Sequence, residues 1–287
     1  MKTGIAFCLL TLLLSFTVGA QTTKPADTSP HTSGFVNANG IKLHYLDWGG
    51  TGETLLFITG VGDTAHTFDE MAPKFTDKFH VLALTRRGYG ESDKPEKGYD
   101  TGTLTEDVRL FLDAMKIDKV NLIAHSAGGN ELIGFASKYP KRTLKLVFLD
   151  AAYDRREVPA ILAKDPLAEP DKPPSTLRER IYAEFIRQMG LYEPPYKKIK
   201  APALSFYAIF EQHWAIKPDT DEATKKKAQD FIEKLAQPYQ FRNAERFRKE
   251  VKRGQVVILR GTNHYFFKDP KQKDAIVTQV RAFLLKK

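Results

Sequence analysis

The stretch NLIAHSAGGNEL, residues 121–132, passes from an apolar, strand-like run through Ser126 into small residues and a helical pattern. A strand–turn–helix junction of the form G-x-S-x-G presents a nucleophilic serine on a strained turn that leaves no room for large neighbours. Ala124 and Gly128 hold the two small positions, and Gly129 adds slack where the helix begins. A serine that only caps the helix is the alternative. The choice between a nucleophilic serine and a helix cap depends on whether the rest of the chain supplies the residues that a nucleophilic serine needs.

Short apolar runs alternate with helix-like segments on both sides of this junction. An Asn39-Gly40 turn within residues 34–49 predicts a hairpin before them. The alternation predicts βαβ units, and hence a mostly parallel, doubly wound α/β sheet with helices on both faces. The runs are TLLFITG (54–60), HVLALT (80–85), KVNLIAH (119–125), LKLVFLD (144–150), APALSFYAIF (201–210) and QVVILRG (255–261).

The alternation stops between Asp150 and Pro202. A breaker-rich segment, KDPLAEPDKPP (164–174), precedes the amphipathic stretch STLRERIYAEFIRQMG (175–190). About fifty residues between two strands are too many for a simple loop. We therefore expect a small helical cap at about residues 153–200, inserted between strands. Its apolar residues either line a pocket or only pack on the core: Phe185, Met189, Leu191 and Tyr192.

The first 20 residues have the layout of a secretory signal peptide, with Lys2 before an apolar run and Ala20 at a cleavage position. The run is short for a membrane span, so we expect cleavage, no stable membrane anchor afterwards and a secreted or periplasmic location. Residues 21–33 predict a flexible leader, which leaves one domain over 34–287. The only cysteine, Cys8, lies in the signal, so the mature chain has no thiol or disulfide.

The net charge of +9, which falls by one when Lys2 is removed, is scattered along the chain and interleaved with acidic residues. Nucleic-acid-binding proteins more often gather such charge on one face. The pattern indicates solvated helix surfaces, and we expect no nucleic-acid partner.

Acyl transfer needs a base beside the serine and N–H donors for the oxyanion. His264, in GTNHYFF after the last apolar run, is the histidine placed to serve as the base. The predicted donors are the N–H of Ala127, directly after the serine, and that of Val61, between Gly60 and Gly62 in the loop after an earlier strand.

The acid that orients the base has two candidates, because both follow Ser126 and precede His264 at strand ends. Asp150 ends LKLVFLD, and Glu211 follows APALSFYAIF one strand later. We favour Asp150, because Glu211 lacks the glycine-containing turn expected before it. The other interpretations are a helix cap for Asp150 and a surface carboxylate for Glu211.

Together these motifs resemble the α/β-hydrolase-fold serine hydrolases, of an esterase-like type with a helical cap. The matching stretches are LLFITGVGDTAHTF, VLALTRRGYGESDKP, VNLIAHSAGG, LVFLDAA and GTNHYFF, which extend over nearly the whole chain after the leader. In the family the first of these often carries His-Gly where this chain has Thr59-Gly60.

The resemblance implies cleavage of an ester, or a related acyl bond of a small to medium acyl substrate, through an acyl-enzyme. Family members that open epoxides or remove halogens carry an aspartate at the position of Ser126. Aminopeptidase-like or carbon–carbon bond hydrolysis, or ligand binding without turnover, are the alternatives. The residues predict no cofactor and no metal, because the set is complete without them, and they do not predict an oligomeric state.

Overall fold

The computed structural model describes residues 30–168 and 173–286. The predicted signal peptide and most of the predicted leader lie outside these ranges. The first strand begins at Thr32, so the last residues assigned to the leader already belong to the sheet. No helix in the described ranges has the length and apolar character needed to cross a membrane.

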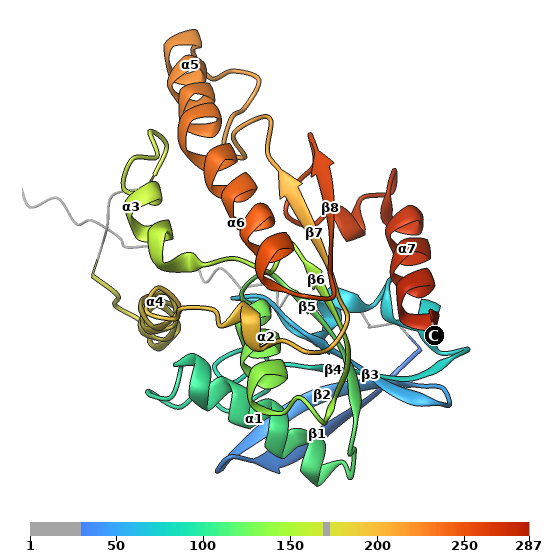
Figure 1. Ribbon diagram of the computed structural model, residues 1–287. Coiled ribbons are helices and arrows are strands. Elements are labelled where there is room, and N and C mark those ends of the chain that lie inside the picture. Colours follow the sequence, from blue (N-terminus) through green and yellow to red (C-terminus); the bar gives the residue numbers. More distant parts are fainter. Residues whose placement is uncertain (1–29, 169–172, 287) are drawn as a thin grey trace, which may run out of the picture.

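The core is one eight-stranded sheet in the order β1-β2-β4-β3-β5-β6-β7-β8, which confirms the predicted mostly parallel fold (Figure 1). Strands β1 and β2 form the predicted hairpin, β2 pairs antiparallel with β4, and all later pairs are parallel. The strands are β1 (Thr32–Ala38), β2 (Ile41–Gly49), β3 (Glu53–Ile58), β4 (Phe79–Leu84), β5 (Val120–His125), β6 (Thr143–Leu149), β7 (Ala203–Ile209) and β8 (Gly254–Arg260).

Alternating side chains of the central strands feed two cores, one on each face of the sheet. In β3, Leu56 and Ile58 join a cluster with α1 (Thr101–Ala114), α2 (Gly129–Lys138) and α6 (Gln237–Glu250). Leu55 and Phe57 join a second cluster with η1 (Ala65–Phe68), η2 (Ala72–Phe75) and α7 (Lys273–Leu285). Both faces are therefore covered, and the carboxyl ends of the strands remain available for a site.

Two insertions lie beyond those carboxyl ends (Figure 1). Between β6 and β7 the chain forms η4 (Arg155–Glu157), α3 (Val158–Leu162), α4 (Leu177–Met189) and η5 (Tyr196–Lys198), where the sequence predicted a helical cap. A capping box between Thr176 and Glu179 fixes the start of α4. Between β7 and β8 the chain forms α5 (Glu222–Phe231) and η6 (Ile232–Ala236), which continue into α6.

Candidate functional site

Ser126 stands on a strained turn at the end of β5. Its φ of +53° lies in the left-handed region, which non-glycine residues adopt at an energetic cost. The chain then enters the short turn η3 (Ser126–Gly128) and α2. A Cβ on Gly128 would lie 2.7 Å from the Thr59 carbonyl oxygen, and one on Gly129 only 2.0 Å from the Ala151 carbonyl oxygen. Gly129 thus permits the start of α2 to pack closely against the Ala151 backbone, whereas the sequence indicated only conformational freedom at this position.

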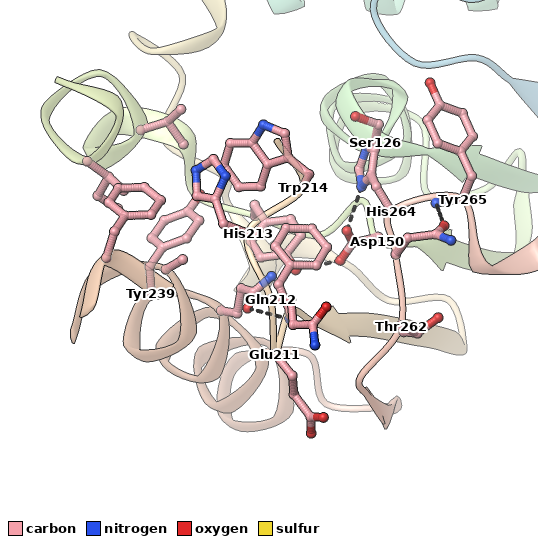
Figure 2. A pocket seen from close by; sticks show the side chains of 18 of the residues that line it. Ser126, Asp150, Glu211, Gln212, His213, Trp214, Tyr239, Thr262, His264 and Tyr265 are labelled. Carbon is pink, nitrogen blue, oxygen red and sulfur yellow. Dashed lines mark hydrogen bonds and ion pairs between the residues drawn. The ribbon is translucent and has the colours of Figure 1, made fainter. Parts of the chain in front are cut away.

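His264 is hydrogen-bonded to Asp150. Its Nδ1 lies 2.6 Å from Asp150 Oδ2, and the carboxylate is only 3% exposed. Asp150 directly follows β6 and, like Ser126, has a positive φ, of +49°. Because Nδ1 carries the proton toward the carboxylate, Nε2 is left as an acceptor. Ser126 and His264 line the same cavity, and Figure 2 shows the imidazole between the serine and the carboxylate.

Two further donors orient the Asp150 carboxylate. The Tyr153 hydroxyl donates to Oδ1 over 2.5 Å, and the backbone N–H of Ala208 donates to the same oxygen over 3.0 Å. Burial, together with the neighbouring carboxylate, raises the pKa of Tyr153 well above its ordinary value, so the phenol stays protonated and keeps donating. The carboxylate is therefore held with Oδ2 free to accept from His264.

Glu211, the other candidate acid, takes a different position. It is exposed at the rim of the same cavity, with its carboxylate against Gly261. Figure 2 shows that its side chain points away from His264, and no hydrogen bond or ion pair joins the two residues. The structure therefore brings Asp150, and not Glu211, to the imidazole.

The loop after β3 reaches the predicted nucleophile. A Cβ on Gly60 would lie 3.0 Å from the Cβ of Ser126, a tighter contact than most Cβ atoms make, so glycine favours this close approach of the backbone. Gly62 has a φ of +81°, which turns the chain away again. Val61 packs against the cluster that contains Ala127 and Phe185 of α4. Both predicted oxyanion donors thus belong to segments that contact one another beside Ser126.

His125, the residue before Ser126, contacts the loop of His264. Its Nε2 lies 3.1 Å from the His264 carbonyl oxygen, and the two ring centroids are 4.4 Å apart. Its Nδ1 lies 3.4 Å from Asp63, which also accepts from the Tyr265 hydroxyl. These contacts link the loop of Val61 to the loop of His264, and they join residues too distant along the chain for a local motif to reveal.

Arg155, in η4, is a second residue that sequence reasoning missed. Its guanidinium donates to the backbone carbonyls of Ser126 (2.8 Å) and Ala151 (3.2 Å). It also donates to the side chain of Asn130 and to the Tyr153 carbonyl. The arginine therefore ties the turn of Ser126 to the turn of Asp150, and both of these residues have left-handed backbone.

A cavity of about 1000 Å³ opens beside Ser126. The apolar cap residues predicted as possible lining do not face it: Phe185 and Met189 are buried in the cluster over Ala127, Tyr192 packs on the core and Leu191 is exposed. His66 lies outside the cavity as well. Together with His31 and Asp69, His66 forms the one group of three or more His, Cys, Asp or Glu residues in the described ranges whose ligand atoms all lie within 4.8 Å of one another.

The chain is similar to known proteins of one fold. The family model for the alpha/beta hydrolase fold matches residues 53–263. An epoxide hydrolase of Caenorhabditis elegans is 32% identical over 130 residues, 44% of this chain and 32% of that protein. An N-formylmaleamate deformylase of Pseudomonas putida is 33% identical over 118 residues, 41% of this chain and 44% of that protein. The match thus spans less than half the length of these relatives.

A solved structure extends the similarity over most of the chain. A carboxylesterase from Bacillus subtilis superposes with a TM-score of 0.62, covering 91% of this chain and 93% of its own, at 15% identity. At that identity the superposition shows a shared fold.

Proposed function

Because the chain belongs to the alpha/beta hydrolase family, we propose that it is a serine hydrolase that cleaves an ester bond through an acyl-enzyme. The hydrogen bond between His264 and Asp150, beside a serine on a strained turn, is the observation that carries the proposal. It supplies a base with a fixed tautomer next to a hydroxyl nucleophile, the arrangement that acyl transfer requires.

In the proposed mechanism, the Ser126 hydroxyl attacks the ester carbonyl carbon while Nε2 of His264 accepts its proton. The N–H groups of Val61 and Ala127 stabilise the oxyanion of the tetrahedral intermediate. The intermediate collapses when the imidazolium returns the proton to the leaving alcohol, and the acyl-enzyme remains. Water, deprotonated by the same imidazole, then releases the acid and regenerates Ser126. Asp150 stabilises the imidazolium in both halves without itself taking the proton.

The cavity favours an ester over a peptide amino terminus. An aminopeptidase needs a carboxylate free to bind the substrate ammonium group. Of the three carboxylates that line the cavity, Asp150 is bonded to His264 and Asp269 accepts from Lys271 and Gln272, so two are engaged. The third, Glu211, is exposed at the rim, and its side chain points away from His264 (Figure 2). One relative is named as an epoxide hydrolase. Family members that open epoxides start the reaction from an aspartate at the position of Ser126, and this chain has a serine there.

Hydrolysis of p-nitrophenyl acetate tests the proposal against its alternatives. We expect a burst of p-nitrophenol equal to the enzyme concentration, followed by slower steady-state turnover. Leucine p-nitroanilide and a vinylogous 1,5-diketone, which report amide and carbon–carbon cleavage, should be hydrolysed far more slowly. Ser126→Ala should lower ester turnover by roughly 10⁴-fold or more. Faster cleavage of the amide or the diketone would contradict the assignment, and a folded protein that hydrolyses none of the three would indicate ligand binding without turnover.

We also propose that the protein acts outside the cytoplasm after loss of its first 20 residues. The support is the apolar run after Lys2 and the small residues that end at Ala20. N-terminal sequencing of the exported protein should begin at Gln21. Recovery of the full-length chain from the cytoplasm alone would contradict this proposal.

A further inference from the structure

The cavity beside Ser126 is large for a small acyl ester. Its volume of about 1000 Å³ lies at the upper end of the range of roughly 300–1000 Å³ that is usual for ligand pockets. It extends from Ser126 and His264 to the residues after β7 and to α5. Figure 2 shows this reach, with Ser126, Asp150 and His264 at one side and His213, Trp214 and Tyr239 at the other. An acetyl group would occupy only the catalytic end.

The walls away from the catalytic end are mostly aliphatic and aromatic. They come from both insertions, so that α3 faces the segment after β7 and α5. Phe210 and Ile161 pack against the small cluster that contains Phe231. Leu162 and Trp214 also line the cavity and are 43% and 60% exposed, which leaves apolar surface at its solvent side. Such a surface binds hydrocarbon by excluding water.

The buried polar side chains on these walls are already bound to protein atoms, whereas Glu211 and Gln212 are exposed at the solvent side. The guanidinium of Arg155 donates to four protein oxygens, including the Ser126 carbonyl. His213 accepts from the Ala215 N–H at Nδ1 and donates from Nε2 to Asp165 over 3.0 Å. Gln240 donates to the Ala208 carbonyl. A charged ligand arm would have to displace these internal contacts, whereas an uncharged chain leaves them intact.

From this arrangement, and resting on the proposed esterase function, we infer that the cavity binds a linear, uncharged hydrocarbon chain. The substrate class is then an ester with one long apolar arm, on either the acyl or the alcohol side of the bond. The chain lies between α3 and the Trp214 segment, and the ester carbonyl lies at Ser126.

Two series of esters test this inference and distinguish the two sides of the bond. One contains p-nitrophenyl acetate, butyrate, octanoate and dodecanoate; the other contains acetates of ethanol, butanol, octanol and dodecanol. Full burial of each methylene favours binding about fourfold. We expect kcat/KM to rise by roughly a hundredfold or more from the shortest to the eight-carbon member of one series. The series that rises identifies the arm that the cavity holds.

Variants of the wall should change this length preference. Ile161→Trp narrows the cavity, and Leu162→Glu places a charge on its wall at a position exposed enough to tolerate the change. Each should lower the octanoyl-to-acetyl ratio of kcat/KM, or the corresponding ratio for the alcohol series, by about tenfold or more. Leu191→Trp is the matched control, because Leu191 is 66% exposed and does not line the cavity, and its ratio should not change.

A binding measurement separates failure of this inference from failure of the proposed function. Titration of Ser126→Ala protein with 1-decanol should change tryptophan fluorescence saturably, and Trp214→Phe should remove the change, because Trp48 does not line the cavity. Saturable binding without ester hydrolysis by the wild type would contradict the esterase proposal but support the hydrocarbon site. Equal kcat/KM along both series, or ratios unchanged by both wall variants, would overturn the inference, as would the absence of saturable decanol binding.

Discussion

The imidazole of His264 and the carboxylate of Asp150, 114 residues apart in the chain, share a hydrogen bond of 2.6 Å. The bond joins the loop after β8 to the residue that follows β6, although β7 lies between these strands in the sheet. Asp150 reaches across because its left-handed backbone and three hydrogen bonds, from His264, Tyr153 and Ala208, fix its side chain.

This bond predicts unequal effects of changing the two candidate acids. Asp150→Asn should lower kcat by about 10³- to 10⁴-fold, because the amide no longer holds the productive tautomer of His264 or stabilises the imidazolium. Glu211→Gln is the matched control and should stay within about twofold of wild type, because it removes an exposed charge outside the hydrogen-bonded set. Steady-state hydrolysis of p-nitrophenyl acetate measures both. A larger loss in Glu211→Gln would reverse the assignment.

Activity should rise with pH along one limb that reports His264, since only the neutral imidazole can accept the serine proton. His125 should stay neutral near pH 7, because burial lowers its pKa despite the opposing effect of Asp63. The pH dependence of kcat/KM measures the limb. His80→Gln is a suitable control, since His80 pairs with Asp47 away from the cavity, and the variant should keep the same profile. A flat profile from acid to neutral pH would contradict the role of His264.

The strained turn predicts a difference in stability between two inactive variants. Both Ser126→Gly and Ser126→Ala lose the hydroxyl, but only glycine adopts a φ of +53° without steric cost. Ser126→Gly should therefore be more stable than Ser126→Ala by roughly 1 kcal/mol, after allowance for the greater freedom of glycine in the unfolded chain. Urea unfolding measures the two free energies. A more stable alanine variant would mean that the turn carries no strain.

Glu106 should make the fold sensitive to acid. Burial raises its pKa, but hydrogen bonds from Lys138, Tyr139 and Arg109 outweigh this and lower the pKa from 4.5 to about 2. A lowered pKa means that the folded state favours the carboxylate, so its contribution to stability is present above pH 4.5 and is lost as pH falls toward 2. We expect the urea midpoint of Glu106→Gln to fall less than that of wild type over this range.

Glu91→Gln is the control for that measurement, because Glu91 is exposed and has no ion-pair partner in the described ranges. Its midpoint should follow the wild-type curve. Parallel curves for wild type and Glu106→Gln would contradict the prediction.

The sequence predicted those parts of the site that local chemistry determines. Ser126 could be recognised because small residues surround it, and His264 because it follows the last strand in the chain order of this fold. The sequence favoured Asp150 over Glu211 but could not exclude Glu211, since both residues follow strands. The hydrogen bond that distinguishes them depends on the direction of the side chains. The first strand begins at Thr32 because pairing with Asp47 overrides a polar, leader-like composition.

Contacts between distant segments could not be predicted. Arg155 lies in a segment whose sequence is typical of a solvated cap. Its hydrogen bonds depend on the Ser126 and Ala151 carbonyls lying close together in the fold. The link of His125 to His264 spans 139 residues. Phe231 ends a highly charged helical segment, and nothing local indicates that it lines a cavity with Ser126.

Covalent labelling of Ser126 tests the central claim most directly. A fluorophosphonate reacts with a serine only where a neighbouring base and oxyanion donors activate the hydroxyl. Intact-protein mass spectrometry should show a single adduct on the wild type, localised to Ser126 by peptide mapping, and none on Ser126→Ala. Asp150→Asn should label much more slowly than Glu211→Gln. A folded wild-type protein that gains no mass, or that is labelled equally after Ser126→Ala, would contradict the account.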